Sequence, residues 1–589
     1  MPILSGCGGF VFGSWICFWF LRLARRGRLL DDHRCKWMHI LRKIWAPTRV
    51  RLKLVQGSEV WRHRTYAVGL LTWDSVHCIA LLAKWAGEAN EEMVKRTEQL
   101  SKQSTASWQK WVLEQLGVGA GGLHKLSKRT AMTFTEPVEK DGAVSLSTQD
   151  ILDHDRAVWQ EVWHRHADVA TAPWREQLRD WQKWCTWAPK LPAIGAEDIR
   201  KAAKTFKAAT ALGVDAFRPR WLTLLSDELL DAYGQLLGDI ESIGIWPNQV
   251  MTILIAQLPK PDGGRRPIGL LPTIVRVWER IRQPIMLSWR LTVERPYNWA
   301  TRGRAPQDAV WRRALYDEAA DADGQETGAV LVDLTKAFEM VRLDLVWKTG
   351  LRTHMHPVIL SLVLESFAFA RRLTADGVVT EPVHSLSAIL AGGGFATDAL
   401  FVVLCRACDE LLIMHPEVDM CLFVDDLTIH CSGSQDYVIE QLTSAVDDVI
   451  GMFEEDLGLT VSRTKTVAVA STPTLTTRLR PMLRKYGIQT KDKVKFLGVD
   501  YCGGSKITRE VQNQRFQSVK GRANRYRQCG RRAARHLLRT GAAPAIRYGS
   551  VVVGAPDTLV KQVRQFSCSV EGDMRGKSAF GRLQLSGYD

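Results

Sequence analysis

The hydrophobic pattern divides the chain into a helical first part and a mixed second part. Apolar and aromatic residues recur at helical spacing in residues 159–166, 174–187 and 199–238. From about residue 257 to residue 501, short β-prone runs alternate with helical stretches, which is the pattern of a sheet covered by helices. The sequence therefore predicts an α+β (mixed α/β) fold preceded by a mainly helical N-terminal region.

The composition of the chain and its glycine-rich and polar segments suggest four parts. Fifteen of the 22 Trp lie before residue 190, and none follows Trp347. Residues 117–122 (GVGAGG) predict a flexible break, and the polar residues 136–147, which lack a period, predict a linker. We expect a Trp-rich helical region, a connector with a helical extension, a mixed α/β part and a basic helical part, over residues 1–120, 121–198, 199–504 and 505–589.

The chain is strongly basic, which favours a polyanionic partner. Its 79 Lys and Arg against 63 Asp and Glu give a formal net charge of +16, which suits a phosphate backbone or an anionic surface. Residues 505–550 hold twelve of the Lys and Arg against one acid, Glu510. The predicted nucleic-acid contacts there are Arg522, Arg525, Arg527, Arg531, Arg532 and Arg535.

Cysteine usage and hydropathy bear on the compartment. The twelve Cys are scattered, and the one C-x-x-C pair, Cys405 and Cys408, lies in a helix-like run without a second pair at zinc spacing. This pattern indicates reduced thiols and a nuclear or cytoplasmic location. Residues 10–23 are very apolar but shorter than the ~20 residues of a membrane helix. A membrane anchor stays open there beside a buried helix, and the sequence gives no strong indication of a membrane elsewhere.

Two segments carry candidate chemistry. Residues 420–433 (MCLFVDDLTIHCSG) read as an apolar hairpin with Asp425 and Asp426 at its tip, and residues 329–341 (AVLVDLTKAFEMV) place Asp333 at the end of a β-prone run. A solvated turn is the plainer reading of the hairpin. Adjacent buried carboxylates, however, repel unless a cation neutralises them. Three such carboxylates could form an oxygen-rich metal site of the two-metal kind that serves phosphoryl transfer.

The order of these and further motifs resembles that of reverse transcriptases of the non-LTR retrotransposon type. The resemblance runs from about residue 199 to the C-terminus. It begins with an early G-x-D motif at residues 210–220 and a basic fingers motif at residues 258–272. Motifs A, C and D follow at residues 332–341, 423–426 and 457–470. The primer grip lies at residues 494–499, and a Tyr-Gly pair lies at residues 548–549.

The resemblance implies a right-hand polymerase with fingers, palm and a helical thumb. It implies RNA-directed synthesis of DNA with two Mg²⁺ ions, or Mn²⁺, on an RNA template with a DNA primer and deoxynucleoside triphosphates. It leaves the oligomeric state open. The implied metal ligands are Asp333, Asp425 and Asp426, and Lys465 is a further catalytic residue. Lys260, Arg266, Phe338 and Gly393 would bind the nucleotide, with Phe338 as the gate against a 2′-hydroxyl, and Phe496, Leu497 and Gly498 would grip the primer.

The chain departs from the family in motif B, and other readings stay open. Residues 390–404 read LAGGGFATDALFVVL, so Gly392 occupies the place of the usual Gln, while Gly393 fits the family glycine. Glu339 stands where motif A usually has Asp. An inactive relative that still binds nucleic acid, and an intron maturase-like splicing factor, are the alternatives. No endonuclease motif is recognisable, and we expect a fragment of a longer reading frame.

Overall fold

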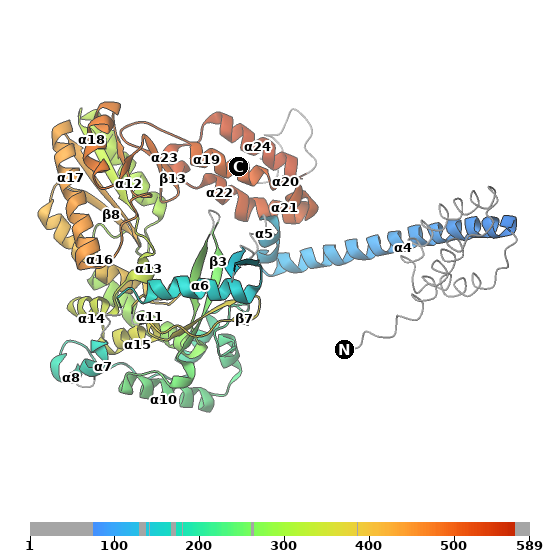
Figure 1. The fold of residues 1–589 in the computed structure, drawn as a ribbon, viewed down its shortest axis with the longest axis horizontal. Helices are drawn as coiled ribbons and strands as arrows, with labels where there is room; N and C mark the ends of the chain where they lie inside the picture. Colours follow the sequence, from blue (N-terminus) through green and yellow to red (C-terminus); the bar gives the residue numbers. More distant parts are fainter. Residues whose placement is uncertain are drawn as a thin grey trace. The chain divides into compact units, whose positions relative to one another are not determined.

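The structure is a computed structural model that describes residues 75–128, 137–140, 142–166, 172–178, 181–260, 264–385 and 387–571. The apolar run at residues 10–23 lies outside this part of the chain. Two compact units are present, one of Met1–Lys125 with Tyr526–Leu537, and one of Leu126–Arg525 with Leu538–Asp589 (Figure 1). No helix within the described residues is long and apolar enough to cross a membrane.

The first unit is built around the long helix α4 (Ser75–Gly117) and also contains α21 (Arg531–Leu537). The rings of Trp108 and Trp111 stack with centroids 5.2 Å apart, and Trp108 Nε1 donates to the Gln528 carbonyl oxygen at 3.1 Å. Helix α4 ends at Gly117, and α5 (Gly121–Ser127) follows a turn in which Gly119 has φ +92°. The predicted break at residues 117–122 is confirmed as a break between helices.

A five-stranded sheet forms the centre of the second unit, in the order β11-β10-β5-β9-β8. Strand β5 (Glu326–Val332) pairs antiparallel with both β9 (Asp426–Gly433) and β10 (Val467–Ala470). The edges are β8 (Asp419–Phe423), antiparallel to β9, and β11 (Gln489–Thr490), parallel to β10. The hairpin expected at residues 420–433 is confirmed.

Residues of β5 alternate between two covered faces, as the pleat of a strand requires. A side chain at Gly328 would meet Leu442 and Val438 of α17 (Gln435–Gly451), so this glycine lets that helix approach closely. Ala329 packs on the other face with Ala309 and Val310 of α12 (Pro306–Ala322). Helices α16 (Ala396–Met414), α18 (Pro473–Arg484) and the π-turn η5 (Met452–Asp456) complete the α17 side.

A second sheet has four strands in the order β4-β3-β6-β7. Strand β3 (Thr252–Pro259) pairs antiparallel with β4 (Arg265–Leu270) and parallel with β6 (Ala370–Ala375), which continues into β7 (Val378–Val379). Helix α15 (Pro357–Phe367) is buried along its whole length. The other helices of this region are α9 (Ala196–Lys204), η3 (Pro219–Leu224), α10 (Asp227–Ile243), η4 (Asn248–Val250), α11 (Thr273–Thr292), α13 (Ala337–Met340) and α14 (Leu343–Arg352).

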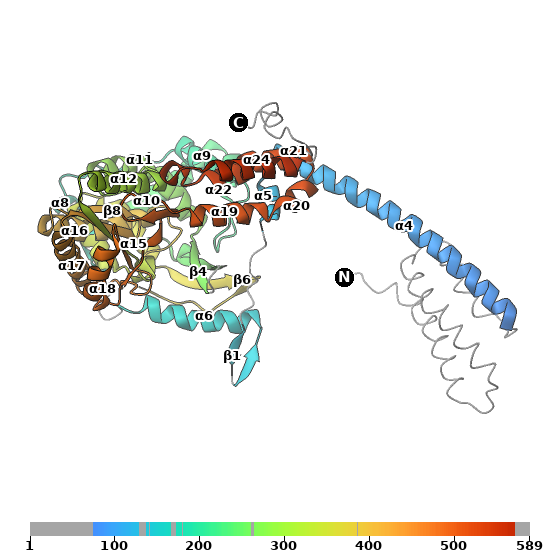
Figure 2. The same cartoon turned by 90° about the horizontal axis from the view of Figure 1, so that it is seen from above.

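The segment before the sheets packs into their core. Helix α6 (Thr148–Trp163) lies beside β6 and β7 (Figure 2), and α7 (Pro173–Gln177) and α8 (Trp181–Trp184) follow it. Trp163 is 1% exposed and accepts hydrogen bonds at its carbonyl oxygen from the hydroxyls of Ser385 (2.8 Å) and Ser387 (2.5 Å). Trp159 and Trp174 are also buried. These aromatic residues therefore serve helix packing and offer no surface for stacking bases.

Two local expectations need correction. The described part of residues 136–147 is not a plain linker, because β1 (Val138–Lys140) and β2 (Ala143–Ser145) form an antiparallel hairpin. The helical pattern of residues 199–238 is interrupted between α9 and α10. There Asp215 accepts a hydrogen bond from Thr273 N at 2.5 Å and caps the N-terminus of α11. The G-x-D motif is therefore a turn that fits the start of α11.

Helices follow the last sheet, as predicted. The hairpin of β12 (Lys493–Phe496) and β13 (Val499–Cys502) leads into α19 (Glu510–Lys520), α20 (Ala523–Gln528), η6 (Leu538–Ala542), α22 (Ala543–Arg547), α23 (Ser550–Val553) and α24 (Asp557–Glu571). Asp500 accepts hydrogen bonds from Val511 N (2.8 Å) and Gln512 N (3.0 Å). This aspartate joins the hairpin to the first turn of α19.

Two glycines of α10 provide a test of this packing. An alanine methyl group at Gly234 would collide with the Ile194 carbonyl oxygen, whereas one at Gly238 would meet nothing within 4 Å. We expect Gly238→Ala to stabilise the protein by about 0.5–1 kcal/mol, because alanine is the better helix former. Gly234→Ala should destabilise it by roughly 1–3 kcal/mol through overpacking. Thermal unfolding of the two variants measures both effects, and equal shifts would contradict the Ile194 contact.

Candidate active site

Three carboxylates lie at one end of the five-stranded sheet. Asp333 follows the last residue of β5, and Asp426 is the first residue of β9. Because Val332 pairs with Leu427, the register places Asp333 opposite Asp426. Asp425 is the second residue of the two-residue turn between β8 and β9, directly after Val424. The pairing of two strands thus brings together residues that are about 90 positions apart in the sequence.

The turn that carries Asp425 is strained. Val424 has φ +62°, a left-handed conformation that is rare for a β-branched residue and costs of order 1–3 kcal/mol. Such outliers cluster where a side chain must be aimed at a functional site. The strain therefore supports a special role for the hairpin tip.

The pKa values of the three carboxyl groups are raised. Burial is the main cause at Asp333, and the ammonium groups of Lys465 and Lys260 oppose that rise in pKa. Burial also raises the pKa of Asp425, and the charge of Asp333 adds to it. Although the Asp426 side chain lies at the surface, loss of hydration on its protein side and the charges of Asp425 and Asp333 raise its pKa to about 6. The carboxylates therefore repel one another across a partly desolvated site.

A loop after η5 holds Asp333 and presents Lys465. The Ser462 N–H donates to the Asp333 carbonyl oxygen at 2.7 Å, and Asp333 N donates to Thr466 Oγ1 at 3.2 Å. Lys465 Nζ is 3.8 Å from Asp333 Oδ2, while 65% of the lysine side chain stays exposed. Asp333 Oδ2 itself is buried and has no hydrogen-bond partner. Apart from the long ion pair with Lys465, this buried oxygen is left for a ligand that the protein does not supply.

The oxygen atoms of these carboxylates suit a divalent cation, although the three side chains do not converge on one point. Carboxylate oxygens are the ligands that Mg²⁺ prefers, and the unsatisfied Asp333 oxygen and the mutual repulsion are both relieved by a cation. In the part of the chain that the structure describes, no group of three or more His, Cys, Asp and Glu is spaced to hold a metal ion. The residue types fit the metal, and a change of side-chain rotamers would have to close the site.

Two cations of the β3–β4 hairpin act on the carboxylates. Lys260 follows β3, and its charge opposes the rise in the pKa of Asp333, while the exposed Arg266 opposes the rise in the pKa of Asp425. Arg265, next to Arg266, is instead paired with the buried Asp155 of α6 at 2.5 Å. Of the two adjacent arginines, Arg266 is therefore the one available to a nucleotide. The turn residues 261–263 lie outside the described part of the chain.

Phe338 lies in the short helix α13, just beyond Asp333, and is half-buried against the core. The neighbouring Lys336 has φ +50°, and its ammonium group lies 4.7 Å from the centre of the Trp159 ring, a cation–π contact that anchors the loop. Burial raises the pKa of Glu339. Helix α6, through Trp159, thus supports the loop that leads into α13 and the predicted gate Phe338.

The glycines of motif B pack against protein backbone. Gly392 has φ +111°, and a side chain there would meet the Gly269 carbonyl oxygen of β4 at 2.7 Å. The Gly269 N–H donates to the Ala391 carbonyl oxygen at 2.7 Å. The buried Glu279 of α11 accepts a hydrogen bond from Gly394 N at 2.9 Å, and burial raises its pKa to about 7. The loop is therefore held by β4 on one side and by Glu279 of α11 on the other. The close contact with the Gly269 carbonyl oxygen accounts for glycine at position 392, where the family usually has Gln. Sequence reasoning missed Glu279, because a helix glutamate ordinarily lies on the surface.

The predicted primer grip is the turn of the β12–β13 hairpin. Leu497 and Gly498 both have positive φ, +43° and +82°, as a two-residue type I′ turn requires. Tyr548 OH donates to the Leu497 carbonyl oxygen at 2.9 Å, and the Arg515 guanidinium donates to that of Gly498. Phe496 is buried below the turn. Tyr548 of the Tyr-Gly pair noted in the sequence therefore holds this turn in place.

The six predicted nucleic-acid-binding arginines fall in both units. Arg522 and Arg525 are half-buried in the second unit, where Arg525 donates to the Ser127 carbonyl oxygen at 3.3 Å. The exposed members belong to the first unit and are Arg527, Arg531, Arg532 and Arg535. Exposure makes these four better candidates for phosphate contacts than the other two.

The raised pKa of Asp426 predicts a pH dependence of stability. The folded protein binds this proton more tightly than the unfolded chain, so the contribution of Asp426 to stability falls as pH rises from about 4 to about 6 and is then constant. Asp426→Asn removes the repulsion and should raise the melting temperature at neutral pH in the presence of chelator. The gain should shrink as the pH falls below about 6, where wild-type Asp426 becomes protonated.

Asp419→Asn on the same hairpin is the matched control. Asp419 pairs with Arg312 at 3.0 Å and Arg313 at 3.2 Å, so its loss should lower the melting temperature at neutral pH. A less stable Asp426→Asn variant under these conditions would contradict the electrostatic description of the site.

Comparison with known proteins identifies one part of the chain. Residues 258–501 match the family model described as reverse transcriptase (RNA-dependent DNA polymerase). No curated protein matches the chain. Among solved structures, apo telomerase from Candida tropicalis truncated from its C-terminal domain is 12% identical over 44% of this chain and 55% of that chain, with a TM-score of 0.32.

Two further telomerase structures from Candida tropicalis are similar to a comparable degree. The apo form is 12% identical over 58% of this chain and 64% of that chain, and the complex with the TWJ fragment of telomeric RNA is 9% identical over 66% and 79%. Both have a TM-score of 0.34, which does not establish a common fold. The chain thus covers less than two thirds of the first two structures. On the strength of the family model, residues 258–501 are a reverse transcriptase domain.

Proposed function

We propose that the chain is an RNA-directed DNA polymerase of a non-LTR mobile element. It would add deoxynucleotides to the 3′-hydroxyl of a DNA primer on an RNA template. The observation that carries the proposal is the set of three mutually repelling carboxylates, Asp333, Asp425 and Asp426, at the end of two paired strands within the reverse transcriptase domain. The order of the motifs along the chain supports the non-LTR type.

Asp333, Asp425 and Asp426 would hold two Mg²⁺ ions, with Mn²⁺ as a substitute. When bound, such ions activate the attacking hydroxyl and stabilise the leaving pyrophosphate. The protein supplies positive charge around the same place through Lys465, Lys260 and Arg266, which suits a triphosphate. Electrostatic preorganisation of this kind is usually the largest contribution to catalysis.

The remaining predicted residues would position the substrates. Phe338 would exclude a 2′-hydroxyl beside the sugar, and Gly393 would line the floor below the nucleotide. The Phe496–Gly498 turn would hold the primer end. Basic helices after the β12–β13 hairpin would bind the template–primer duplex through its phosphates, which position the duplex without reading its sequence.

The first test removes a carboxylate charge. Asp333→Asn or Asp425→Asn should lower primer extension on an RNA template by ~10³-fold or more. Binding of template–primer should be nearly unchanged, because phosphates are met by Lys and Arg elsewhere. Asp376→Asn, at the exposed turn between β6 and β7, is the control and should extend primers like wild type. Wild-type protein that binds duplex but extends no primer would instead favour the inactive, nucleic-acid-binding alternative.

The second test concerns the exposed arginines of α21. Replacing Arg531, Arg532 and Arg535 with Gln should reduce the slope of log affinity against log salt by roughly 2–3 units if all three contact phosphates. Replacing Arg480, Arg484 and Lys485, at the end of α18, removes the same charge and should leave the slope nearly unchanged. Titrations of a template–primer duplex at several salt concentrations measure the slope. A wild-type slope for the α21 variant would exclude this helix from the binding surface.

A further inference from the structure

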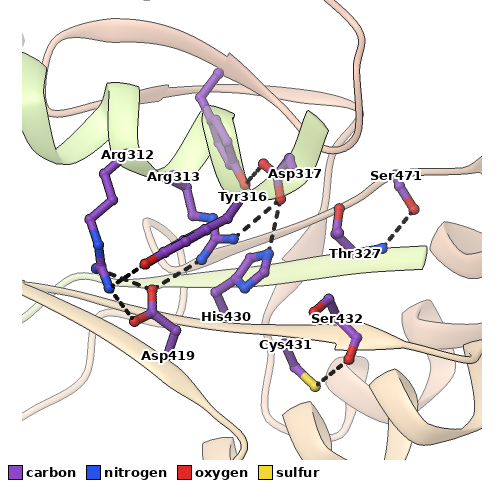
Figure 3. Close-up of polar contacts among 11 residues, drawn as sticks. Arg312, Arg313, Tyr316, Asp317, Thr327, Asp419, His430, Cys431, Ser432 and Ser471 are labelled. Carbon is purple, nitrogen blue, oxygen red and sulfur yellow. Dashed lines mark hydrogen bonds and ion pairs between the residues drawn. The ribbon is translucent and has the colours of Figure 1, made fainter. Parts of the chain in front are cut away.

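A buried polar cluster connects the five-stranded sheet to α12 and to the β12–β13 hairpin. Its centre is Asp317 of α12, which has no exposed surface. His430 Nε2 of β9 lies 2.9 Å from Asp317 Oδ1, and Tyr501 OH of β13 donates to Asp317 Oδ2 at 2.7 Å. Arg313, one turn earlier in α12, lies 3.6 Å from the same carboxylate (Figure 3). We call these four residues the Asp317 cluster.

The charges of the cluster are set by its surroundings. Burial and the nearby Arg313 lower the pKa of His430 to about 4, so this histidine is neutral at physiological pH. Burial raises the pKa of Tyr501, which therefore stays a hydrogen-bond donor. Arg313 also contacts Asp419 at 3.2 Å, and Arg312 reaches the same aspartate at 3.0 Å (Figure 3). Arg313 thus lies between Asp317 of its own helix and Asp419 of β8, the strand next to β9.

The cluster joins two parts of the structure that share no backbone ladder. Strands β12 and β13 pair with each other in a separate two-stranded sheet. Phe496 and Val499 of this hairpin belong to one apolar cluster with Val310 of α12 and Cys421 of β8. Apolar contacts of this kind are not directional, whereas a short hydrogen bond fixes both distance and angle. Tyr501 and Asp317 therefore supply the directional part of the attachment.

Both ends of this attachment are only a few positions along the chain from predicted functional residues. His430 is four residues after Asp426 on β9, and Tyr501 is three residues after Gly498 of the hairpin turn. We propose that Asp317 is a positioning residue that, through His430 and Tyr501, sets the β12–β13 hairpin against the strand that begins at Asp426. This inference rests on the proposed function, in which the hairpin holds the primer end and Asp426 belongs to the metal site.

The proposed reaction depends on the distance between the primer end and the metal site. A primer hydroxyl must approach the reacting phosphorus to about 3–3.5 Å, and a displacement of ~1 Å can cost ~10²-fold in rate. Tyr501→Phe removes one hydroxyl and keeps the ring, so it releases the attachment with little change in packing. The nucleotide pocket, built from other elements, should be unaffected. The effect should therefore appear in the use of primer and not in the affinity for deoxynucleotide.

The matched control is Tyr297→Phe. Tyr297 is also buried, and its hydroxyl donates to Asp409 at 2.6 Å, with the Cys405 carbonyl oxygen at 3.0 Å as a second acceptor within reach. Both variants lose a hydrogen bond from a buried tyrosine to an aspartate, and only Tyr501→Phe releases the hairpin. A merely structural role would therefore make the two variants alike.

Steady-state primer extension gives the first readout. We expect Tyr501→Phe to lower kcat/KM for template–primer by about 10- to 100-fold while the KM for deoxynucleotide stays at the wild-type value. Tyr297→Phe should match wild type in both parameters. If the two variants lose activity equally, or if the loss at Tyr501 appears in the deoxynucleotide KM, the positioning role is excluded.

Hydrogen exchange gives a second readout that needs no activity. In Tyr501→Phe, the amides of residues 493–502 should exchange faster than in wild type, because the hairpin opens locally. The amides of β5 and β9 should be unchanged, and Tyr297→Phe should leave residues 493–502 protected. Wild-type protection in Tyr501→Phe would overturn the attachment itself. If wild-type protein extends no primer, the proposed function fails, whereas the exchange result still decides whether Asp317 holds the hairpin.

Discussion

The antiparallel pairing of β5 with β9 is the constraint on which the rest of the structure depends. It brings Asp333 to the level of Asp426, and the turn before β9 adds Asp425. Three like charges in a partly buried place are unfavourable, so the strands must be held by other means. Gly328 admits α17 on one face and Ala329 packs on α12 on the other. The apolar cover on both faces offsets the repulsion at the tip.

The parts of the fold that the sequence could predict are those with local signals. An apolar run ending in Asp333, and an apolar hairpin with paired Asp at its turn, can be recognised from periodicity and turn chemistry. The basic helical tail is equally local. The interruption of the helical pattern near Gly213 was missed, because its cause is distant. A side chain at Gly213 would meet the Leu271 carbonyl oxygen at 2.5 Å.

Contacts between distant side chains could not be predicted in the same way. Tyr501 and Asp317 are 184 residues apart, and Arg265 and Asp155 are 110 apart. An aspartate on a helix or an arginine in a hairpin looks like a surface residue until its partner is known. Motif B illustrates the difference. The glycine run indicates a close approach of backbone, and the structure identifies the partner of Gly392 as the Gly269 carbonyl oxygen.

The burial of Trp163 has a consequence for how the chain is made. Ser385, whose hydroxyl bonds the Trp163 carbonyl oxygen, lies 222 residues later in the sequence. A ribosome that adds ~5–20 residues per second needs roughly 10–40 seconds to synthesise that interval. During this time α6 has no sheet to pack on, and its tryptophans face solvent or a chaperone. The nascent chain is therefore exposed to aggregation until the part of the reverse transcriptase domain that contains β6, β7 and Ser385 has been translated.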